Sequence, residues 1–159
     1  MGLPGQAGNM AIENLLLAVG PTDDQRIEPL ARTATDIAGP AGATVTLAHV
    51  FTREEYEDIA DNLGFEEGDE VTADVVARRH ATIRDLEDHL SDAGVDYGVR
   101  GHIGEHGESI VALADDVNAD IAVVGGRKRS PAGKAVFGST AQTVLLSAPC
   151  PVTFVRSDH

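Results

Sequence analysis

Residues 125–140 read GGRKRSPAGKAVFGST and combine glycines and hydroxyl side chains with basic residues. Both lysines of the chain, Lys128 and Lys134, lie here beside Arg127 and Arg129, although the formal net charge of the protein is -14. Bare glycine backbone approaches a ligand closely, and the first turn of a helix attracts anions. Because the basic residues add positive charge to these groups, the segment predicts an anion-binding site.

Two well-known phosphate-binding motifs do not fit this segment. A P-loop needs G-x-x-x-x-G-K followed by Ser or Thr, but the first glycine position is Lys128 and Ala135 follows the Gly133-Lys134 pair. The dinucleotide motif G-x-G-x-x-G also fails, because Gly125 and Gly126 are adjacent. The remaining alternatives are a different kind of anion site and a solvated surface loop.

The elements around this segment alternate between strand and helix. Short apolar runs predict strands at 14–20, 43–50, 95–104, 119–126 and 150–156. Amphipathic or capped segments predict helices at 21–42, 71–94, 106–118 and 139–149. Five strands alternating with four helices indicate an α/β fold, a single doubly wound five-stranded parallel sheet with helices on both faces. Ligands of such Rossmann-like sheets bind beyond the carboxyl ends of the strands, and the glycine-rich segment leaves the fourth strand there.

Some boundaries in this prediction are specific. We expect Thr22 or Asp23 to cap the first helix, Pro29 to lie in its first turns, and Gly39-Pro40 to end it. Residues 71–94 should form one long helix that Gly94 ends. Residues 51–70 are acidic and poorly periodic, so they predict a long loop with at most one helical turn.

Composition narrows the class of protein. A chain of 159 residues with 42% apolar residues is one globular domain; we expect a flexible tail at 1–11 and the domain at 12–157. The acidic charge disfavours nucleic acid and anionic membranes as partners, and no apolar run reaches the length of a membrane span. One cysteine, Cys150, permits no internal disulfide, which fits a cytoplasmic protein. The charge and the scarcity of lysine suit either a high-salt adaptation or an acidic protein of an ordinary cytoplasm.

The chain resembles the universal stress protein family from NLLLAVG at 14–20 to PVTFVR at 151–156, with AVVGG, GST and APCPVTFVR as the specific segments. Nucleotide-binding members carry G-x2-G-x9-G followed by Ser or Thr, which places Gly125, Gly138 and Ser139 in the motif. The resemblance implies an adenine nucleotide alpha hydrolase-like fold and binding of ATP or a related nucleotide. The site residues that we expect on this basis are Val50, Val124, Gly125, Arg127, Lys128, Gly138, Ser139 and Thr140.

Two positions depart from the family pattern. The second motif glycine is Lys128, which would obstruct the phosphates or pair with them. The aspartate that follows the first strand in nucleotide-binding members is Gly20, with Asp23 three residues later. Three functions therefore stay open: an ATP-binding stress-response protein, a nucleotide-free dimeric adaptor, and a slow nucleotide hydrolase for which no base is apparent. The resemblance also implies a homodimer formed through the last strand, around Val152 and Phe154.

Three further positions carry chemistry-bearing side chains. His102, Glu105 and His106 are close in sequence and would suit a metal, but a polar loop at a strand end is the preferred interpretation because loop geometry does not hold both histidines on one face. His49 lies in an apolar strand and is expected to be a hydrogen-bonded core histidine and not a catalytic one. Cys150 has no basic neighbour that would activate it, so we expect a small packed residue. The sequence thus names no catalytic and no metal-binding residue.

Overall fold

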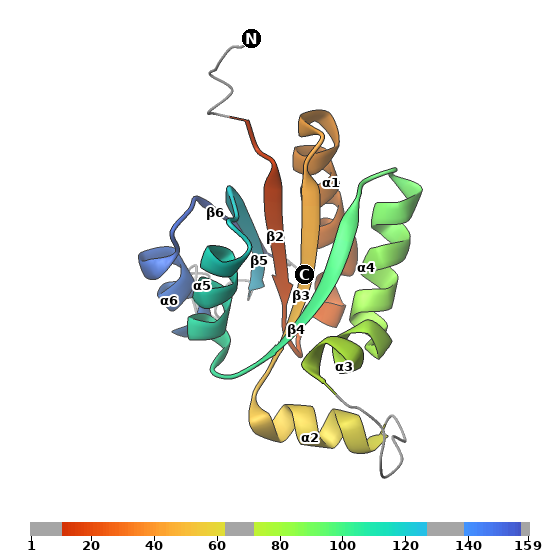
Figure 1. Ribbon diagram of the computed structural model, residues 1–159, viewed down its shortest axis with the longest axis vertical. Coiled ribbons are helices and arrows are strands. Elements are labelled where there is room, and N and C mark those ends of the chain that lie inside the picture. Colours follow the sequence, from red (N-terminus) through yellow and green to blue (C-terminus); the bar gives the residue numbers. More distant parts are fainter. Residues whose placement is uncertain (1–10, 63–71, 127–138, 157–159) are drawn as a thin grey trace, which may run out of the picture.

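The computed structural model describes residues 11–62, 72–126 and 139–156. Its centre is a 5-stranded sheet in the order β4-β3-β2-β5-β6, with every neighbouring pair parallel (Figure 1). The strands are β2 (Asn14–Val19), β3 (Thr44–Phe51), β4 (Tyr97–Ile103), β5 (Ile121–Gly126) and β6 (Val152–Arg156). The direction of strand order reverses between β2 and β5, which confirms the predicted doubly wound α/β fold.

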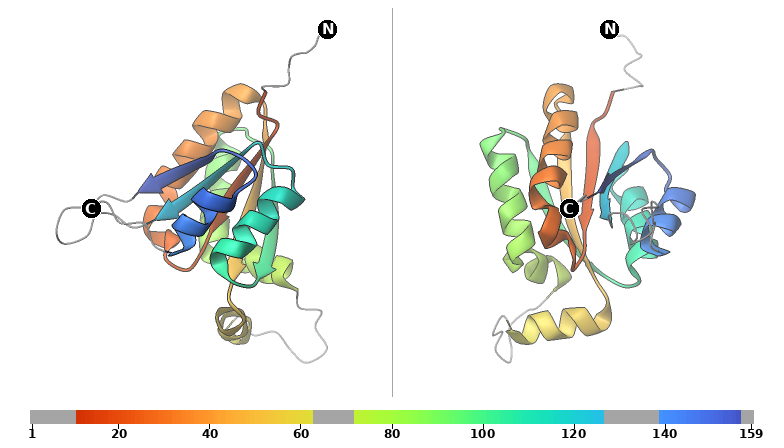
Figure 2. Two further views of the ribbon diagram at one scale, coloured as in Figure 1. Left: turned by 90° about the vertical axis from the view of Figure 1, so that its left-hand side faces the viewer. Right: turned by 180° about the vertical axis from the view of Figure 1, so that it is seen from behind.

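Helices cover both faces of the sheet. In chain order they are α1 (Ile27–Ala41), α2 (Arg53–Asn62), α3 (Ala73–Arg79), α4 (Ala81–Asp92), α5 (His106–Asp116) and α6 (Ser139–Ser147), with a 3-10 turn η2 (Asp23–Arg26) before α1. Figure 2 shows α1 and α4 on one face and α5 and α6 on the other. None of the helices in the described ranges is both long enough and apolar enough to cross a membrane.

The central strand β2 explains why its sequence is apolar throughout. Leu15 and Leu17 pack into the core beneath α1 and α4, whereas Leu16 and Ala18 pack into the second core beneath α5 and α6. All of these side chains are at most 2% exposed. Because alternate residues of a strand point to opposite faces, a strand that is covered on both sides loses the usual apolar–polar alternation.

The first helix is longer than its sequence predicts. Pro29 lies in the first turn of α1, as expected, but the helix continues through Gly39-Pro40 to Ala41. Gly42 ends it in a left-handed conformation with φ of 68°, and its N–H group donates to the carbonyls of Ala38 and Gly39. The expected stop at Gly39-Pro40 is therefore wrong. A glycine tolerates this φ, so the left-handed cap is placed at Gly42.

The first part of the acidic segment after β3 is a helix, so the prediction of a loop is wrong for residues 53–62; the rest of that segment lies outside the described residues. Residues Arg53–Asn62 form α2, in which no side chain is fully buried. Thr52 and Glu55 make a capping box: Thr52 Oγ1 accepts the N–H of Glu55 at 3.2 Å, and Glu55 Oε1 accepts the N–H of Thr52 at 2.9 Å. This reciprocal pair starts the helix without a continuous apolar face.

The single helix expected at 71–94 is two helices, because His80 interrupts it. His80 has an extended backbone, with φ of -71° and ψ of 134°, and its Nδ1 accepts the N–H of Thr82 at 3.3 Å. The side chain thus caps α4 while the chain changes direction after α3. Gly94 has a φ of 72°, in agreement with its expected place after the C-terminus of α4.

The short helix α3 lies against the outer side of the edge strand β4. Asp74 Oδ1 accepts the N–H of Gly101 at 2.7 Å. A Cβ atom at Gly101 would overlap the carbonyl of Ala73, so glycine is needed for this approach. The start of α3 therefore satisfies a backbone group that an edge strand otherwise leaves free to pair with another chain.

Candidate functional site

A cleft of about 400 Å³ opens at the carboxyl ends of β2 and β5, where the strand order reverses. Its walls come from β2 and the turn after it, from β3 and β5, and from the helices α5 and α6. The lining residues are Ala18, Val19, Gly20, Pro21, Thr22, Asp23, Val50, His106, Ile110, Val124, Gly125, Gly126, Thr140, Ala141 and Val144. This is the position at which an open α/β sheet binds its ligands.

The structure brings several of the predicted site residues together. Val50, Val124, Gly125 and Thr140 line the cleft. Ser139 is the first residue of α6. The other three predicted residues, Arg127, Lys128 and Gly138, lie outside the described residues.

The two glycines that end β5 are required by their neighbours. A Cβ atom at Gly125 would lie 2.6 Å from Asp23 Oδ1 and 2.6 Å from Arg26 Cδ. A Cβ atom at Gly126 would overlap the ring of Phe154 on β6. Both positions therefore need glycine to let side chains from other elements approach the backbone, whatever ligand the cleft takes.

Asp23 and Arg26 form a buried ion pair beside Gly125. Asp23 Oδ1 accepts a hydrogen bond from Arg26 Nη1, and Asp23 Oδ2 accepts the N–H of Gly20 at 2.7 Å. The two residues are 7% and 5% exposed. Burial raises the pKa of the Asp23 carboxyl, although the Gly20 N–H and the Arg26 charge act in the opposite direction. The carboxylate of Asp23 thus lies against the backbone of Gly20, the position at which the family pattern has an aspartate.

Sequence reasoning noted Asp23 as a candidate helix cap and as a displaced aspartate, and it missed Arg26. The i, i+3 spacing of an acidic and a basic residue was the available signal, but such pairs usually lie on a solvated helix surface. Their burial follows from the position of η2 against the end of β5, which is a tertiary contact.

A second polar pair borders the cleft. His106 Nε2 lies 2.9 Å from Glu55 Oε1, which joins the start of α5 to the start of α2. In the part of the chain that the structure describes, no group of three His, Cys, Asp or Glu side chains is arranged to hold a metal ion. His106 therefore pairs with a carboxylate from a distant segment of the chain. It does not form a metal-binding group with His102 and Glu105 in the described residues.

His49 is buried, as expected, but the expected hydrogen bond is wrong. It is 1% exposed, and neither ring nitrogen has a hydrogen-bond partner among the described residues. Its ring stacks on Phe51 with centroids 4.2 Å apart and meets His80 at the same distance. Burial, and secondarily the charge of His80, lowers the pKa of His49 to about 3, so the ring is neutral and packs as an aromatic group.

Cys150 is partly buried and packs against the core beneath α5 and α6. Burial, and then the nearby charge of Asp120, raises the pKa of its thiol. Because the thiolate is the reactive form, the structure agrees with the prediction of a packed and unreactive cysteine.

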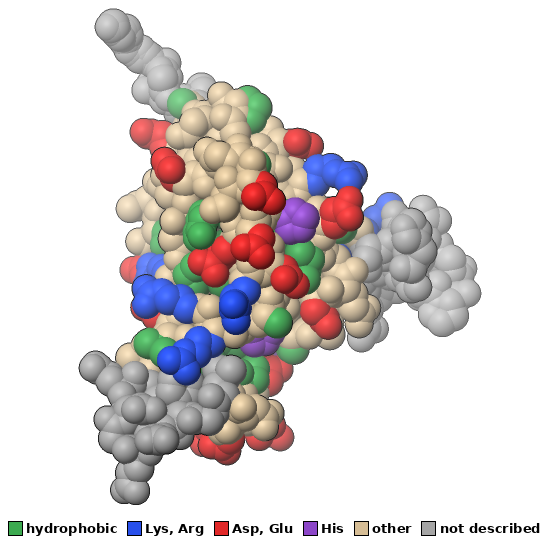
Figure 3. Space-filling model, turned by 90° about the vertical axis from the view of Figure 1, so that its right-hand side faces the viewer, with side chains coloured by type: hydrophobic (Ala, Val, Ile, Leu, Met, Phe, Trp, Pro, Cys, Tyr) green, Lys and Arg blue, Asp and Glu red, His purple; other side chains and the backbone are tan. Residues whose placement is uncertain are grey.

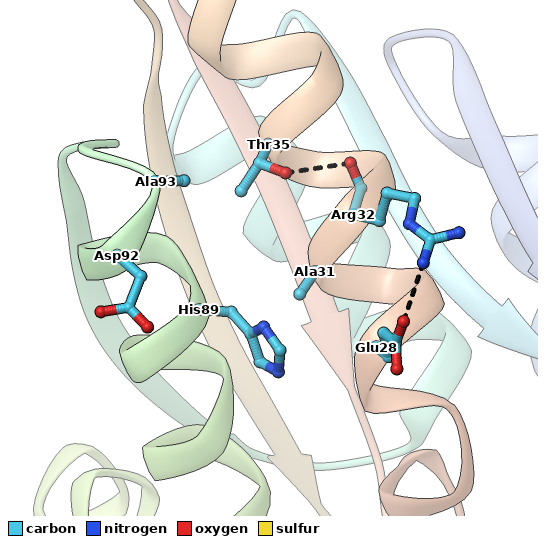
Figure 4. Close-up of a pocket in the computed structure, with 7 residues that line it drawn as sticks. All are labelled: Glu28, Ala31, Arg32, Thr35, His89, Asp92 and Ala93. Carbon is cyan, nitrogen blue, oxygen red and sulfur yellow. Dashed lines mark hydrogen bonds and ion pairs between the residues drawn. The ribbon is translucent and has the colours of Figure 1, made fainter.

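The face that carries α1 and α4 has a different character. Asp and Glu side chains are scattered over it among Arg side chains (Figure 3). A shallow groove of about 390 Å³ runs between the two helices, where Glu28 and Arg32 form an ion pair and His89 and Asp92 stand on the opposite wall (Figure 4). The paired side chains are 71% and 67% exposed, so solvent screens them.

Comparisons with known proteins agree with this fold. The universal stress protein family matches residues 11–156. A universal stress protein of Mycolicibacterium smegmatis (strain ATCC 700084 / mc(2)155) is 38% identical over 79 residues, which are 49% of this chain and 61% of that protein. The match thus spans about three fifths of the length of that relative.

Solved structures of the same family superpose on most of the chain. The structure of a universal stress protein from Archaeoglobus fulgidus has a TM-score of 0.68 at 29% identity and covers 89% of this chain and 97% of its own. A universal stress protein in complex with cAMP has a TM-score of 0.63 at 24% identity, with 92% and 98% covered. A universal stress protein from Archaeoglobus fulgidus in complex with dAMP has a TM-score of 0.58 at 23% identity, with 91% and 98% covered. With the family match over nearly its whole length, this chain belongs to the universal stress protein family.

Proposed function

We propose that the cleft between β2 and β5 binds an adenine nucleotide, ATP or a close relative, as part of a stress response. The proposal depends on one observation: apolar side chains, the glycine backbone at the end of β5 and the first turn of α6 all line the same cleft. Apolar walls suit a flat base, and the backbone and helix end suit phosphate. Relatives of similar fold were solved with cAMP and with dAMP, which supports the choice of adenine.

The proposal gives the two ends of the cleft different tasks. Val50 on β3 and Val124 on β5, the two strands that flank β2, would contact the base. Gly125 and the start of α6 at Ser139 and Thr140 would hold the phosphates. Arg127 and Gly138 would complete the phosphate site, and Lys128 would stand beside it in place of the motif's second glycine.

Asp23 would supply the carboxylate that the family pattern places at Gly20. It lines the cleft, and its two oxygens accept one hydrogen bond each from Arg26 and Gly20. A carboxylate has about four acceptor positions, so Asp23 keeps capacity for a sugar hydroxyl of the nucleotide. Arg26 and Gly20 hold the carboxylate in place before the ligand arrives.

Mass spectrometry of the purified, gently denatured protein tests the proposal. An adenine nucleotide that travels with the protein supports it, and calorimetric titration with ATP then gives the affinity. Absence of a co-purified nucleotide, together with no heat of binding for ATP, would overturn the proposal. The nucleotide-free adaptor would then be the better account.

We also propose a homodimer formed through β6. This strand ends the sheet order, with β5 as its neighbour, whereas α3 covers the opposite edge at β4. An edge strand offers backbone groups to a second copy, and a two-fold axis lets each copy satisfy the other. Leu146 on α6 is 86% exposed, and α6 packs beside β6, so an apolar side chain adjoins the same edge.

A further inference from the structure

His106 is a fixed side chain at the wall of the cleft. Its Nε2 lies 2.9 Å from Glu55 Oε1, and the same oxygen accepts the N–H of Thr52 at 2.9 Å. The side chains of His106 and Glu55 are 24% and 30% exposed. Glu55 is therefore held by the capping box of α2, and it holds the imidazole of the first residue of α5 in turn.

The partner determines which nitrogen of His106 carries the hydrogen atom. An ionised carboxylate accepts hydrogen bonds and does not donate them, so Nε2 must be the donor in this pair. In the neutral imidazole the other nitrogen, Nδ1, is then an acceptor. A carboxylate that fixes a histidine tautomer in this way gives the ring a defined hydrogen-bonding character toward its second neighbour.

His106 lies at the end of the cleft that is nearer to β3. Glu55 follows β3, and β3 lies on the side of β2 opposite to β5. His106 therefore borders the cleft on the Val50 side, with Ile110 one turn further along α5. The glycines of β5 lie on the other side. His106 is thus a polar ring beside the apolar side chains of Val50 and Ile110 in the lining of the cleft.

We propose that His106, oriented by Glu55, selects the base of the nucleotide by accepting a hydrogen bond at Nδ1 from an exocyclic amino group. This inference rests on the proposed nucleotide site and adds its specificity. Adenine carries such an amino group at C6. Hypoxanthine carries a carbonyl oxygen there, which would face the lone pair of Nδ1. A site with a fixed acceptor therefore favours ATP over inosine triphosphate, because the wrong base leaves two acceptors opposed.

Calorimetric titration with ATP and with inosine triphosphate tests this selection in matched variants. His106→Gln keeps a donor that reaches Glu55 but lacks an atom in the place of Nδ1. His106→Asn keeps an acceptor near that place but does not reach Glu55. His89→Gln, in the groove between α1 and α4 (Figure 4), is the control.

We expect the wild-type protein and His89→Gln to prefer ATP to inosine triphosphate by the same ratio. One neutral hydrogen bond corresponds to roughly threefold to tenfold in affinity, so His106→Gln should reduce the ratio by about that factor. His106→Asn should keep a larger part of the ratio than His106→Gln. A purely structural role would give the opposite order, since it is the glutamine that preserves the link to Glu55.

Two results overturn the inference in distinguishable ways. If the wild-type protein binds both nucleotides and His106→Gln leaves the ratio unchanged, His106 does not read the base, although the nucleotide site stands. If the wild-type protein binds neither nucleotide, the proposed function itself fails and this inference fails with it.

Discussion

The carboxylate of Asp23 turns back to the backbone N–H of Gly20, 2.7 Å from Oδ2, while its other oxygen receives Arg26. One carboxylate thus joins the end of β2 to η2 and stands against Gly125 at the end of β5. The side chains of Asp23 and Arg26 are 10% and 5% exposed, so each charge depends on the other for compensation.

Removal of Asp23 should therefore cost more stability than removal of an exposed ion-pair partner. Breaking a buried pair from one side costs about 3–5 kcal/mol, and we expect Asp23→Ala to lower the free energy of unfolding by this amount. Glu28→Ala, which breaks the exposed pair with Arg32, should cost at most about 1 kcal/mol. Chemical denaturation of both variants measures the difference. Equal effects would show that Arg26 finds another compensating group.

Lys128 should restrict nucleotide binding, because the family motif has a glycine at its position. We expect Lys128→Gly to strengthen ATP binding in a calorimetric titration, whereas Lys128→Ala should not, since it removes the charge without freeing the backbone. The competing outcome is specific. A lysine paired with phosphate contributes about 1.5–3 kcal/mol, so a loss of tenfold or more in both variants would show pairing instead of obstruction.

Stability should fall in mild acid because His49 is buried and His80 is half-buried, and burial disfavours the charged form of both rings. Burial lowers the pKa of His49 to about 3, and burial also lowers the pKa of His80, against the opposing charge of Asp24. The unfolded chain, with an ordinary histidine pKa near 6.5, then binds more protons than the folded one as the pH falls. The stability is fully present above about pH 6.5 and is lost progressively toward pH 3.

For His49 alone the linkage predicts a loss of about 2 kcal/mol between pH 7 and pH 5. His49→Phe keeps an aromatic ring against Phe51 and removes this titration, so its unfolding free energy should depend less on pH by that amount. Denaturant unfolding at the two pH values provides the comparison. Parallel pH profiles of variant and wild type would show that His49 is protonated at no cost.

Dimer formation through the edge strand β6 should be prevented by a charged residue and a proline in that strand. We expect the wild-type protein to sediment as a dimer at micromolar concentration, and Val152→Asp combined with Thr153→Pro to yield monomers. Leu146→Asp on α6 is the comparison variant, because Leu146 is 86% exposed beside the same edge. It separates the contribution of the helix to the dimer from that of the strand. A wild-type monomer would end the dimer proposal.

Salt should stabilise the protein if its acidity is a high-salt adaptation. A formal net charge of -14 opposes compaction through self-repulsion, and screening by salt relieves that repulsion. We expect the free energy of unfolding to rise from low to molar KCl concentrations. Thermal unfolding across a KCl series measures it, and full stability at low salt would contradict the adaptation and favour the ordinary acidic protein.

The sequence by itself determined the architecture and the end of the sheet at which the candidate site was expected. Strands such as β2 and β5 are short apolar runs, and their alternation with helical segments permits few topologies other than a doubly wound sheet. Because Gly125 and Gly126 end the apolar run of β5, the segment that follows them was expected at the carboxyl edge of the sheet. Val50 and Val124 were placed in the cleft by family resemblance, and the structure brings them to its walls.

At two further elements the sequence contains the capping residue, but the periodicity of the segment favoured a different prediction. The Thr52–Glu55 capping box starts α2 in a segment whose weak periodicity favoured a loop. His80 divides a helical pattern that runs on both sides of it, because its side chain caps α4. Two reciprocal side chain-to-backbone hydrogen bonds in the first case, and one in the second, set a helix boundary that the periodicity of the surrounding residues does not indicate.

Only the tertiary structure decided which polar side chains meet. Glu55 and His106 are 51 residues apart and pair because β3 and β4 end side by side. Asp23 and Arg26 are near in sequence, yet their burial against Gly125 depends on the pairing of β2 with β5. His49 lost its expected hydrogen bond because aromatic neighbours from β3 and the α3–α4 junction enclose its ring. Such contacts depend on the order of the strands and the placement of the helices, which bring together segments that are far apart in the sequence. A pattern within one segment therefore cannot predict them.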